Sequence, residues 1–147
     1  MSHIEVRSLG GDRFSIECRK HRLVIDQPVE AGGSDTGPTP VELFVSSLPA
    51  CVAFYGRRFL NRHGLPESIA VRAAWEMAER PARVARIDVV VTVTSLPEEL
   101  EEKFRRVIER CTVHNSLTSG VDTSIRVEPE AAPVGHRVGL SPERNRR

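Results

Sequence analysis

The N-terminal part of the chain alternates apolar and polar residues in short runs that predict three β-strands. Residues 4–9 and 14–18 alternate on either side of a Gly-Gly-Asp turn at 10–12, which is typical of a β-hairpin. A short apolar run at residues 23–25 predicts a third strand. Residues 31–40 are rich in glycine and proline and therefore predict a loop.

A long helix is predicted over residues 41–62, where apolar residues recur every three or four positions. Residues 43–55 include no charged side chain, so we expect this helix to be central and covered on several sides. Pro49 lies in its middle. Because a proline removes one backbone hydrogen bond from a helix, we expect a kink or a restart of the helix there. Gly64 and Pro66 predict where the helix ends.

The second half of the chain begins with a predicted hairpin. Residues 69–77 and 87–93 alternate apolar and polar positions on either side of a turn at residues 79–82. β-Branched residues are concentrated in the second of these strands, as is common in sheets. Ser95 and Glu98 then have the spacing of a capping box, which predicts the start of a second helix.

The second predicted helix carries its apolar residues on one face and ends at Cys111. Residues 123–127 alternate again and predict a last strand. The order β-β-β, helix, β-β, helix, β predicts the α+β class, with antiparallel sheets packed on helices. We expect one domain over residues 1–129 and a polar, mobile tail over residues 130–147.

Length and charge restrict the possible partners. The 147 residues suit a single domain, and 21 basic (Lys+Arg) against 20 acidic residues give a net charge of +1. Such a chain has no bulk field with which to bind nucleic acid or an anionic membrane. No apolar run approaches the roughly 20 residues of a membrane helix, and the N-terminus lacks the apolar core of a signal peptide. We therefore expect a soluble, cytoplasmic protein with neither nucleic acid nor membrane as partner.

The three cysteines, Cys18, Cys51 and Cys111, are too few and too widely spaced for a disulfide scaffold. If the helix restarts at Pro49, unpaired N–H groups beside Cys51 favour its thiolate form. Cys51 and Cys111 both face the predicted core, as a sulfenic acid and its resolving thiol would. The alternative is that both are core residues, because cysteine is often buried. Cys18 is most simply interpreted as a packing residue.

The sequence offers little support for a metal or nucleotide site. Cys111 and His114 have the spacing of half a zinc site, but the other histidines are isolated and provide no second pair of ligands. We therefore interpret His114 as a polar residue at a helix end. The glycines within residues 32–37 lack the spacing of a Rossmann or Walker motif. No metal or other cofactor is expected.

Two motifs, in this order, resemble those of the OsmC/Ohr superfamily. Residues 37–51, Gly-Pro-Thr-Pro-Val-Glu-Leu-Phe-Val-Ser-Ser-Leu-Pro-Ala-Cys, resemble its first-cysteine signature. Residues 111–117, Cys-Thr-Val-His-Asn-Ser-Leu, resemble its second-cysteine motif. The order of predicted elements agrees over nearly the whole chain. The resemblance implies an OsmC-like fold with antiparallel sheets around a long central helix, and an intertwined homodimer with active sites at the subunit interface.

The same resemblance implies a cofactor-free thiol peroxidase that reduces organic hydroperoxides in defence against oxidative stress. Cys51 would be the peroxidatic thiolate, which attacks the peroxide bond and becomes a sulfenic acid. Cys111 would be the resolving thiol, which condenses with that sulfenic acid to form a disulfide. An external dithiol would then reduce the disulfide and complete the cycle.

Members of the family also use an arginine that holds the thiolate and a glutamate that orients this arginine. Arg13 and Glu42 are the matching residues of this chain, with Arg19 and Arg22 as alternatives to Arg13. The family glutamate directly follows a proline. In this chain Val41 stands at that position, and Glu42 comes one residue later.

A further departure is Thr112, which replaces the proline that usually follows the second cysteine. These departures leave a second hypothesis open, namely an OsmC-like dimer that binds a small ligand or a thiol-reactive metabolite without peroxidase turnover. The cysteine pair favours the enzyme. The shifted glutamate favours the ligand-binding protein.

Overall fold

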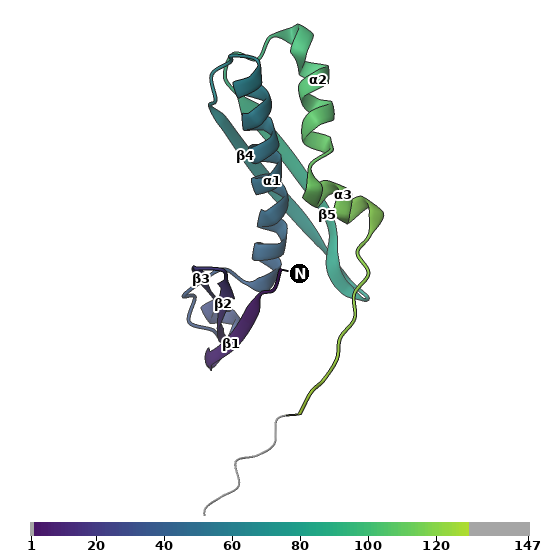
Figure 1. Ribbon diagram of the computed structural model, residues 1–147. Coiled ribbons are helices and arrows are strands. Elements are labelled where there is room, and N and C mark those ends of the chain that lie inside the picture. Colours follow the sequence, from purple (N-terminus) through teal and green to yellow (C-terminus); the bar gives the residue numbers. More distant parts are fainter. Residues whose placement is uncertain (1, 130–147) are drawn as a thin grey trace, which may run out of the picture.

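Two separate antiparallel sheets and three α-helices make up residues 2–129, the part of the chain that the computed structural model describes (Figure 1). The predicted α+β class with antiparallel sheets is thereby confirmed. The tail predicted for residues 130–147 lies outside the described residues. In chain order, the strands and helices are β1 (Glu5–Gly10), β2 (Arg13–Cys18), β3 (His21–Ile25), the 3-10 helix η1 (Val29–Ala31), α1 (Pro40–Arg62), β4 (Ile69–Glu79), β5 (Ala82–Val93), α2 (Glu98–Glu109) and α3 (Thr112–Ser119).

All three predicted N-terminal strands are present, and their sheet has the order β1-β2-β3. Ile16 lies opposite Val6 on one neighbouring strand and opposite Leu23 on the other. β2 is thus the middle strand of this sheet, and Cys18 is its last residue. This small sheet sits at the N-terminal end of α1, away from the second sheet (Figure 1).

The second sheet is the long β4–β5 hairpin, which packs against α1. Its two strands are paired along their length, with Val71 opposite Val91 and Ala73 opposite Val89. Alternate residues of β5, Ile87 among them, are partly buried against the helices, as a period of two requires. In Figure 1 the hairpin forms one layer, and α1 and α2 form the other.

Helix α1 runs for 23 residues without interruption. It begins with a capping box, in which Thr39 Oγ1 accepts from the N–H of Glu42, and the Glu42 carboxylate accepts from the N–H of Thr39. Pro49 lies inside the helix and neither ends nor restarts it, so the expected restart was wrong. The loss of one hydrogen bond at Pro49 is tolerated because the turns on both sides are packed in the core. Gly64, with a φ of 63°, follows the helix end as expected.

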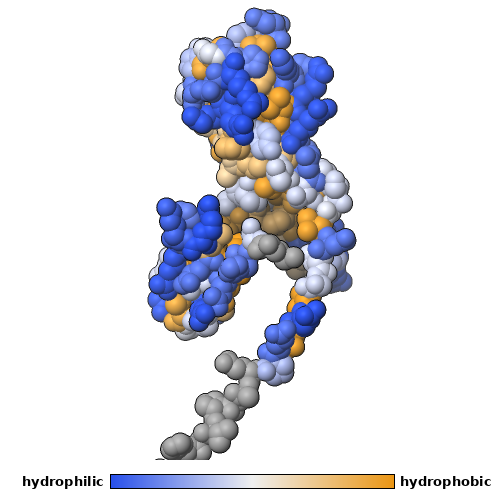
Figure 2. All heavy atoms as spheres, in the orientation of Figure 1, coloured by the Kyte–Doolittle hydropathy of each residue, from blue (hydrophilic) through white to orange (hydrophobic). Residues whose placement is uncertain are grey.

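Only one side of α1 is covered by the rest of the described chain. The buried residues recur every three or four positions and face the sheet and α2; they are Val45, Leu48, Val52, Gly56, Phe59 and Leu60. Phe44 and Phe54 point elsewhere and are 48% and 52% exposed. The expectation of a helix covered on several sides is therefore not met within one chain. Figure 2 shows apolar residues gathered on the surface between the N-terminal sheet and the rest of the molecule.

The C-terminal third differs most from the expectations. The capping box predicted at Ser95 is absent, because Ser95 adopts a φ of 59° and α2 begins after Pro97 without a side-chain cap. α2 ends before Cys111, and the short helix α3 follows, which the sequence analysis missed. The strand predicted over residues 123–127 is also absent. In its place, Ile125 and Val127 are 96% and 82% exposed.

The loop that leads from β3 to α1 is held together by one buried carboxylate. Asp26 is 1% exposed, and its oxygens accept from the backbone N–H groups of Gln27, Ser34 and Thr36 and from the Thr36 hydroxyl. The Thr36 hydroxyl, followed by the backbone donors, lowers the pKa of Asp26 against the opposing effect of burial. The loop also passes so closely that a Cβ on Gly37 would meet the Val24 carbonyl oxygen at 2.2 Å. This packing fixes where α1 begins.

We predict that Asp26→Asn lowers the melting temperature at pH 7, because an amide cannot accept all four bonds. A lowered folded-state pKa gives stability that is present above the unfolded value, about 3.9, and is lost as pH falls through the folded pKa. The difference in melting temperature between Asp26→Asn and wild type should therefore become smaller at acidic pH. Asp35→Asn, an exposed position in the same loop, is the matched control for thermal denaturation between acidic and neutral pH. Equal effects of the two substitutions would contradict this role for Asp26.

Candidate functional site

Two of the three cysteines meet in the core between α1 and the junction of α2 and α3. Cys111 is 0% exposed and forms a buried cluster with Leu48 and Val52. Cys51 is partly buried and packs against the same cluster. The two thiols are close enough for Cys51 to contribute to raising the pKa of Cys111. Both are free thiols, so the site holds the two groups that a disulfide would join.

Cys111 is the N-cap residue of α3, which differs from the position expected at the end of a helix. Its sulfur accepts a hydrogen bond from the N–H of His114 at 3.4 Å, and its carbonyl accepts from the N–H of Asn115 at 3.0 Å. The argument that a helix N-terminus supplies N–H groups to a thiol therefore applies to Cys111. For Cys51, in the middle of α1, that argument was wrong.

Burial dominates the electrostatics of Cys111. Desolvation raises the pKa of this thiol, and proximity to Cys51 raises it further. The N–H groups of His114 and Val113 act in the opposite direction but do not outweigh burial. Cys111 is thus held as a protonated thiol at neutral pH.

A hydrogen bond between side chains attaches α3 to α1. The hydroxyl groups of Tyr55 and Thr112 lie 3.0 Å apart, with Thr112 immediately after Cys111 in the chain. Tyr55 also follows Cys51 by one helical turn, so both belong to the same face of α1. Val113 packs beside them. This arrangement fixes the start of α3 against the helix that carries Cys51.

An apolar cavity of about 300 Å³ lies beside the buried cluster. Arg105, Glu109 and His114 provide its polar groups, and Nδ1 of His114 is bonded to the Glu109 carbonyl oxygen. Apolar walls with few polar groups suit the hydrocarbon part of a small molecule. The sequence analysis did not single out Arg105 and Glu109, because only the helix packing brings them together with His114. The remaining lining residues are Leu48, Val52, Ile87, Val89, Val91 and Ile108.

The other residues expected at the site lie elsewhere. Glu42 is exposed in the capping box of α1, nine residues before Cys51 on a continuous helix, and nine residues turn through about 900°, which places the two on opposite faces. Arg13 begins β2, Arg19 occupies the turn after β2, and Arg22 lies on β3. All three arginines are exposed on the N-terminal sheet. Within one chain, none of these four residues is brought to Cys51.

The described residues form neither a cluster of metal ligands nor a membrane-spanning helix. Across residues 2–129, no group of three or more His, Cys, Asp or Glu side chains is arranged to hold a metal ion. Cys111 and His114 therefore remain without the further ligands that zinc needs. Within the same residues, no helix combines the length and the apolar character needed to cross a membrane.

Comparisons with known proteins agree on one family. The family model described as OsmC-like protein matches residues 32–126. No curated protein matches the chain by sequence. Among solved structures, a protein of Psychrobacter arcticus, named for osmotic stress induction and detoxification response, has a TM-score of 0.72 at 21% identity, with 79% of this chain and 88% of that chain covered.

Two other similar structures bear names that refer to organic hydroperoxides. The organic hydroperoxide resistance protein OsmC of Legionella pneumophila has a TM-score of 0.61 at 20% identity, covering 83% of this chain and 92% of its own. The organic hydroperoxide resistance protein OhrB of Bacillus subtilis has a TM-score of 0.57 at 20% identity, covering 83% and 93%. At these identities, the likeness establishes the fold.

The different environments of the two site cysteines predict different rates of alkylation. With iodoacetamide near pH 8, Cys51 should react several-fold faster than Cys111, because Cys111 is fully buried and its pKa is raised. Peptide mapping by mass spectrometry over a time course measures both rates in one sample. Cys18, which is partly buried in the N-terminal sheet, is the internal control: its labelling shows that the reagent is active. Faster labelling of Cys111 would contradict the described packing.

Proposed function

The chain belongs to the family of OsmC-like proteins, and from this premise we propose that it reduces organic hydroperoxides through Cys51 and Cys111. The observation that carries the proposal is the contact between these two free thiols in one buried cluster. An apolar cavity lined by Leu48 and Val52 of the same cluster supports a hydrocarbon substrate group, although neither cysteine lines it. The names of the Legionella and Bacillus proteins add support for this class of substrate.

The proposed cycle transfers two electrons in each turnover. The Cys51 thiolate attacks the outer oxygen of ROOH, the O–O bond breaks, and a proton converts the leaving alkoxide into ROH. Cys51 is then a sulfenic acid, which Cys111 attacks to form a disulfide and release water. An external dithiol reduces this disulfide by exchange and leaves as its own disulfide.

The proposed roles follow from the positions of the two thiols. Cys51 is the more accessible, so a peroxide reaches it first, whereas Cys111 is enclosed and protonated. A protonated resolving thiol does not compete for the peroxide. Because it is already the neighbour of Cys51, little chain movement separates the sulfenic acid from the disulfide. Breaking the bond between Tyr55 and Thr112 would free the start of α3 for that movement.

We further propose that the complete site needs a second copy of the chain. The proposed arginine and glutamate lie on other parts of the fold, Arg13 at the start of β2 and Glu42 in the first turn of α1. In an intertwined homodimer they would serve the thiol of the partner. Phe44 and Phe54 on α1, which are 48% and 52% exposed, would be covered in such a dimer.

One observation favours the second candidate, a dimer that binds a small ligand without turnover. The Glu42 carboxylate is engaged in capping α1 and is therefore not free to orient an arginine while that bond persists. The oxidation experiment below distinguishes the two candidates. Only a peroxidase would have its Cys51 oxidised in proportion to the peroxide added.

We predict that one equivalent of an alkyl hydroperoxide converts the reduced protein into a form with a Cys51–Cys111 disulfide. Mass mapping without reductant detects the linked peptides. Cys111→Ser should stop at the Cys51 sulfenic acid, which a dimedone adduct reports, because no resolving thiol remains. Cys18→Ser is the matched control and should behave like wild type. If Cys51 stays a free thiol while the peroxide persists, the ligand-binding candidate replaces the peroxidase.

The dimer is tested at the exposed C-terminal segment. Ile125 and Val127 alternate with polar residues, so we expect them to pair with the partner as a strand. Ile125→Asp should weaken the dimer, since burying an isoleucine contributes about 1.5–3 kcal/mol per copy. Light scattering after gel filtration, over a dilution series, measures the shift. Arg126→Asp, on the opposite face of the segment, is the control, and equal behaviour of the two variants would contradict this pairing.

A further inference from the structure

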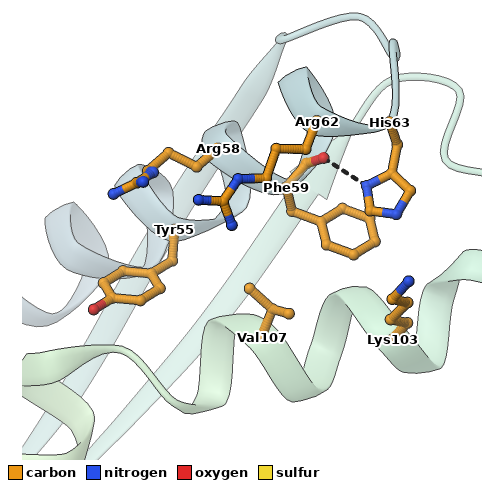
Figure 3. A pocket seen from close by; sticks show the side chains of 7 residues that line it. All are labelled: Tyr55, Arg58, Phe59, Arg62, His63, Lys103 and Val107. Carbon is orange, nitrogen blue, oxygen red and sulfur yellow. Dashed lines mark hydrogen bonds between the residues drawn. The ribbon is translucent and has the colours of Figure 1, made fainter.

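Basic side chains gather in a groove of about 390 Å³ between the C-terminal half of α1 and α2 (Figure 3). Arg58, Arg62 and His63 come from the end of α1, and Lys103 comes from α2. No acidic residue is among those that line the groove. Its remaining lining residues are the aromatic and apolar Tyr55, Phe59 and Val107.

These cations lack the carboxylate partners that neighbouring arginines have. Arg57 pairs with Glu67 at 2.7 Å, and on α2 both Arg105 and Arg106 pair with Glu102. Among residues 2–129, no ion pair is formed by the groove's two arginines or its lysine. A chain of net charge +1 thus concentrates uncompensated positive charge in one hollow.

The acidic residues of α2 face a different hollow. Glu98, Glu101 and Glu102 line a second groove, between α2 and the end of β5. Arg105 also lines this second groove, whereas Lys103 of α2 is directed toward α1 (Figure 3).

The side chains in the groove are oriented by their neighbours. Nδ1 of His63 lies 2.8 Å from the carbonyl oxygen of Phe59, and the two rings stack with centroids 4.0 Å apart. Because Nδ1 is used in this bond, Nε2 of His63 remains for a ligand. In Figure 3 the Arg62 guanidinium extends from α1 over the groove. The Lys103 amine points from α2 toward His63.

We propose that this groove binds a small organic anion, a carboxylate or phosphomonoester attached to an apolar body. The guanidinium of Arg62 and the amine of Lys103 are the groups that recognise such oxyanions. Phe59 and Val107 provide the apolar surface against which the body of the ligand packs. The shared chemistry is a singly or doubly charged oxyanion on a hydrocarbon chain.

The groove and the thiol site share Tyr55. This residue lines the groove, packs against the cluster that contains Cys111, and is bonded to Thr112. An anion that reaches Tyr55 therefore contacts the side chain that holds the start of α3. The binding site itself does not depend on the proposed peroxidase activity, and its test uses no turnover.

Isothermal titration calorimetry with sodium octanoate, octyl phosphate and 1-octanol tests the site in the full-length reduced protein at low ionic strength. At least one anion should bind about tenfold more tightly than the alcohol, because a charged hydrogen bond is worth about 1.5–3 kcal/mol. Comparing the two anions shows whether the groove prefers a carboxylate or a phosphate. Raising the salt to about 150 mM should weaken binding by screening.

Variants identify the groove as the site. Lys103→Glu should reduce the affinity for the anion about tenfold or more, whereas Lys20→Glu, at the only other lysine, in an exposed turn, should leave it unchanged. Arg62→Gln provides a second, milder loss if Lys103→Glu folds poorly by circular dichroism. Equal affinity for octanol and both anions, equal losses in the two lysine variants, or no binding of either anion would overturn the proposal. Anion binding that is weakened by Lys103→Glu or Arg62→Gln but not by Lys20→Glu supports the proposal.

Discussion

The contact between the middle of α1 and the junction of α2 and α3 is the constraint on which the rest of the molecule depends. Leu48 and Val52 bury Cys111 there, and Cys51 joins the same cluster from its place on α1. Because the junction is a turn between two helices, Cys111 is held by backbone groups as well as by packing. The β4–β5 hairpin and α2 form the walls of this cluster and the cavity beside it. The same packing therefore brings the two thiols together, keeps Cys111 protonated and leaves an apolar cavity beside Leu48 and Val52.

The single chain leaves much of its apolar surface uncovered. One face of α1 and the segment of residues 121–127 carry large exposed side chains, and the N-terminal sheet stands apart from the second sheet. The same separation keeps Arg13 and Glu42 away from Cys51. The proposed homodimer would account for both the exposed apolar surface and the incomplete set of site residues. The basic groove at the other end of α1 adds a charged surface that neither thiol chemistry nor this dimer explains.

Sequence patterns predicted most of the secondary structure, because the two hairpins and α1 bury regular stripes of side chains. They failed where tertiary contacts decide. Pro49 does not break α1, since core packing on both sides offsets one lost hydrogen bond. α3 is rich in Thr, Ser, Asn and His, which favour helices weakly, and a contact with Tyr55 distant in sequence secures it. Glu42 was a candidate site residue but caps α1 in the structure. The sequence alone does not distinguish a capping glutamate from a catalytic one. Cys51 and Cys111 were recognisable as a candidate pair, whereas Arg105 and the basic groove required the packing of α1 on α2.

Catalytic turnover tests the central claim, that Cys51 and Cys111 form a redox pair that consumes hydroperoxides. The measurement is the consumption of tert-butyl hydroperoxide with excess dithiothreitol, for wild type and Cys51→Ser side by side. We expect many equivalents of peroxide to be consumed per wild-type chain, and only the rate of the protein-free blank for the variant. A wild-type rate that equals the blank, or a Cys51→Ser rate that equals wild type, would contradict the account.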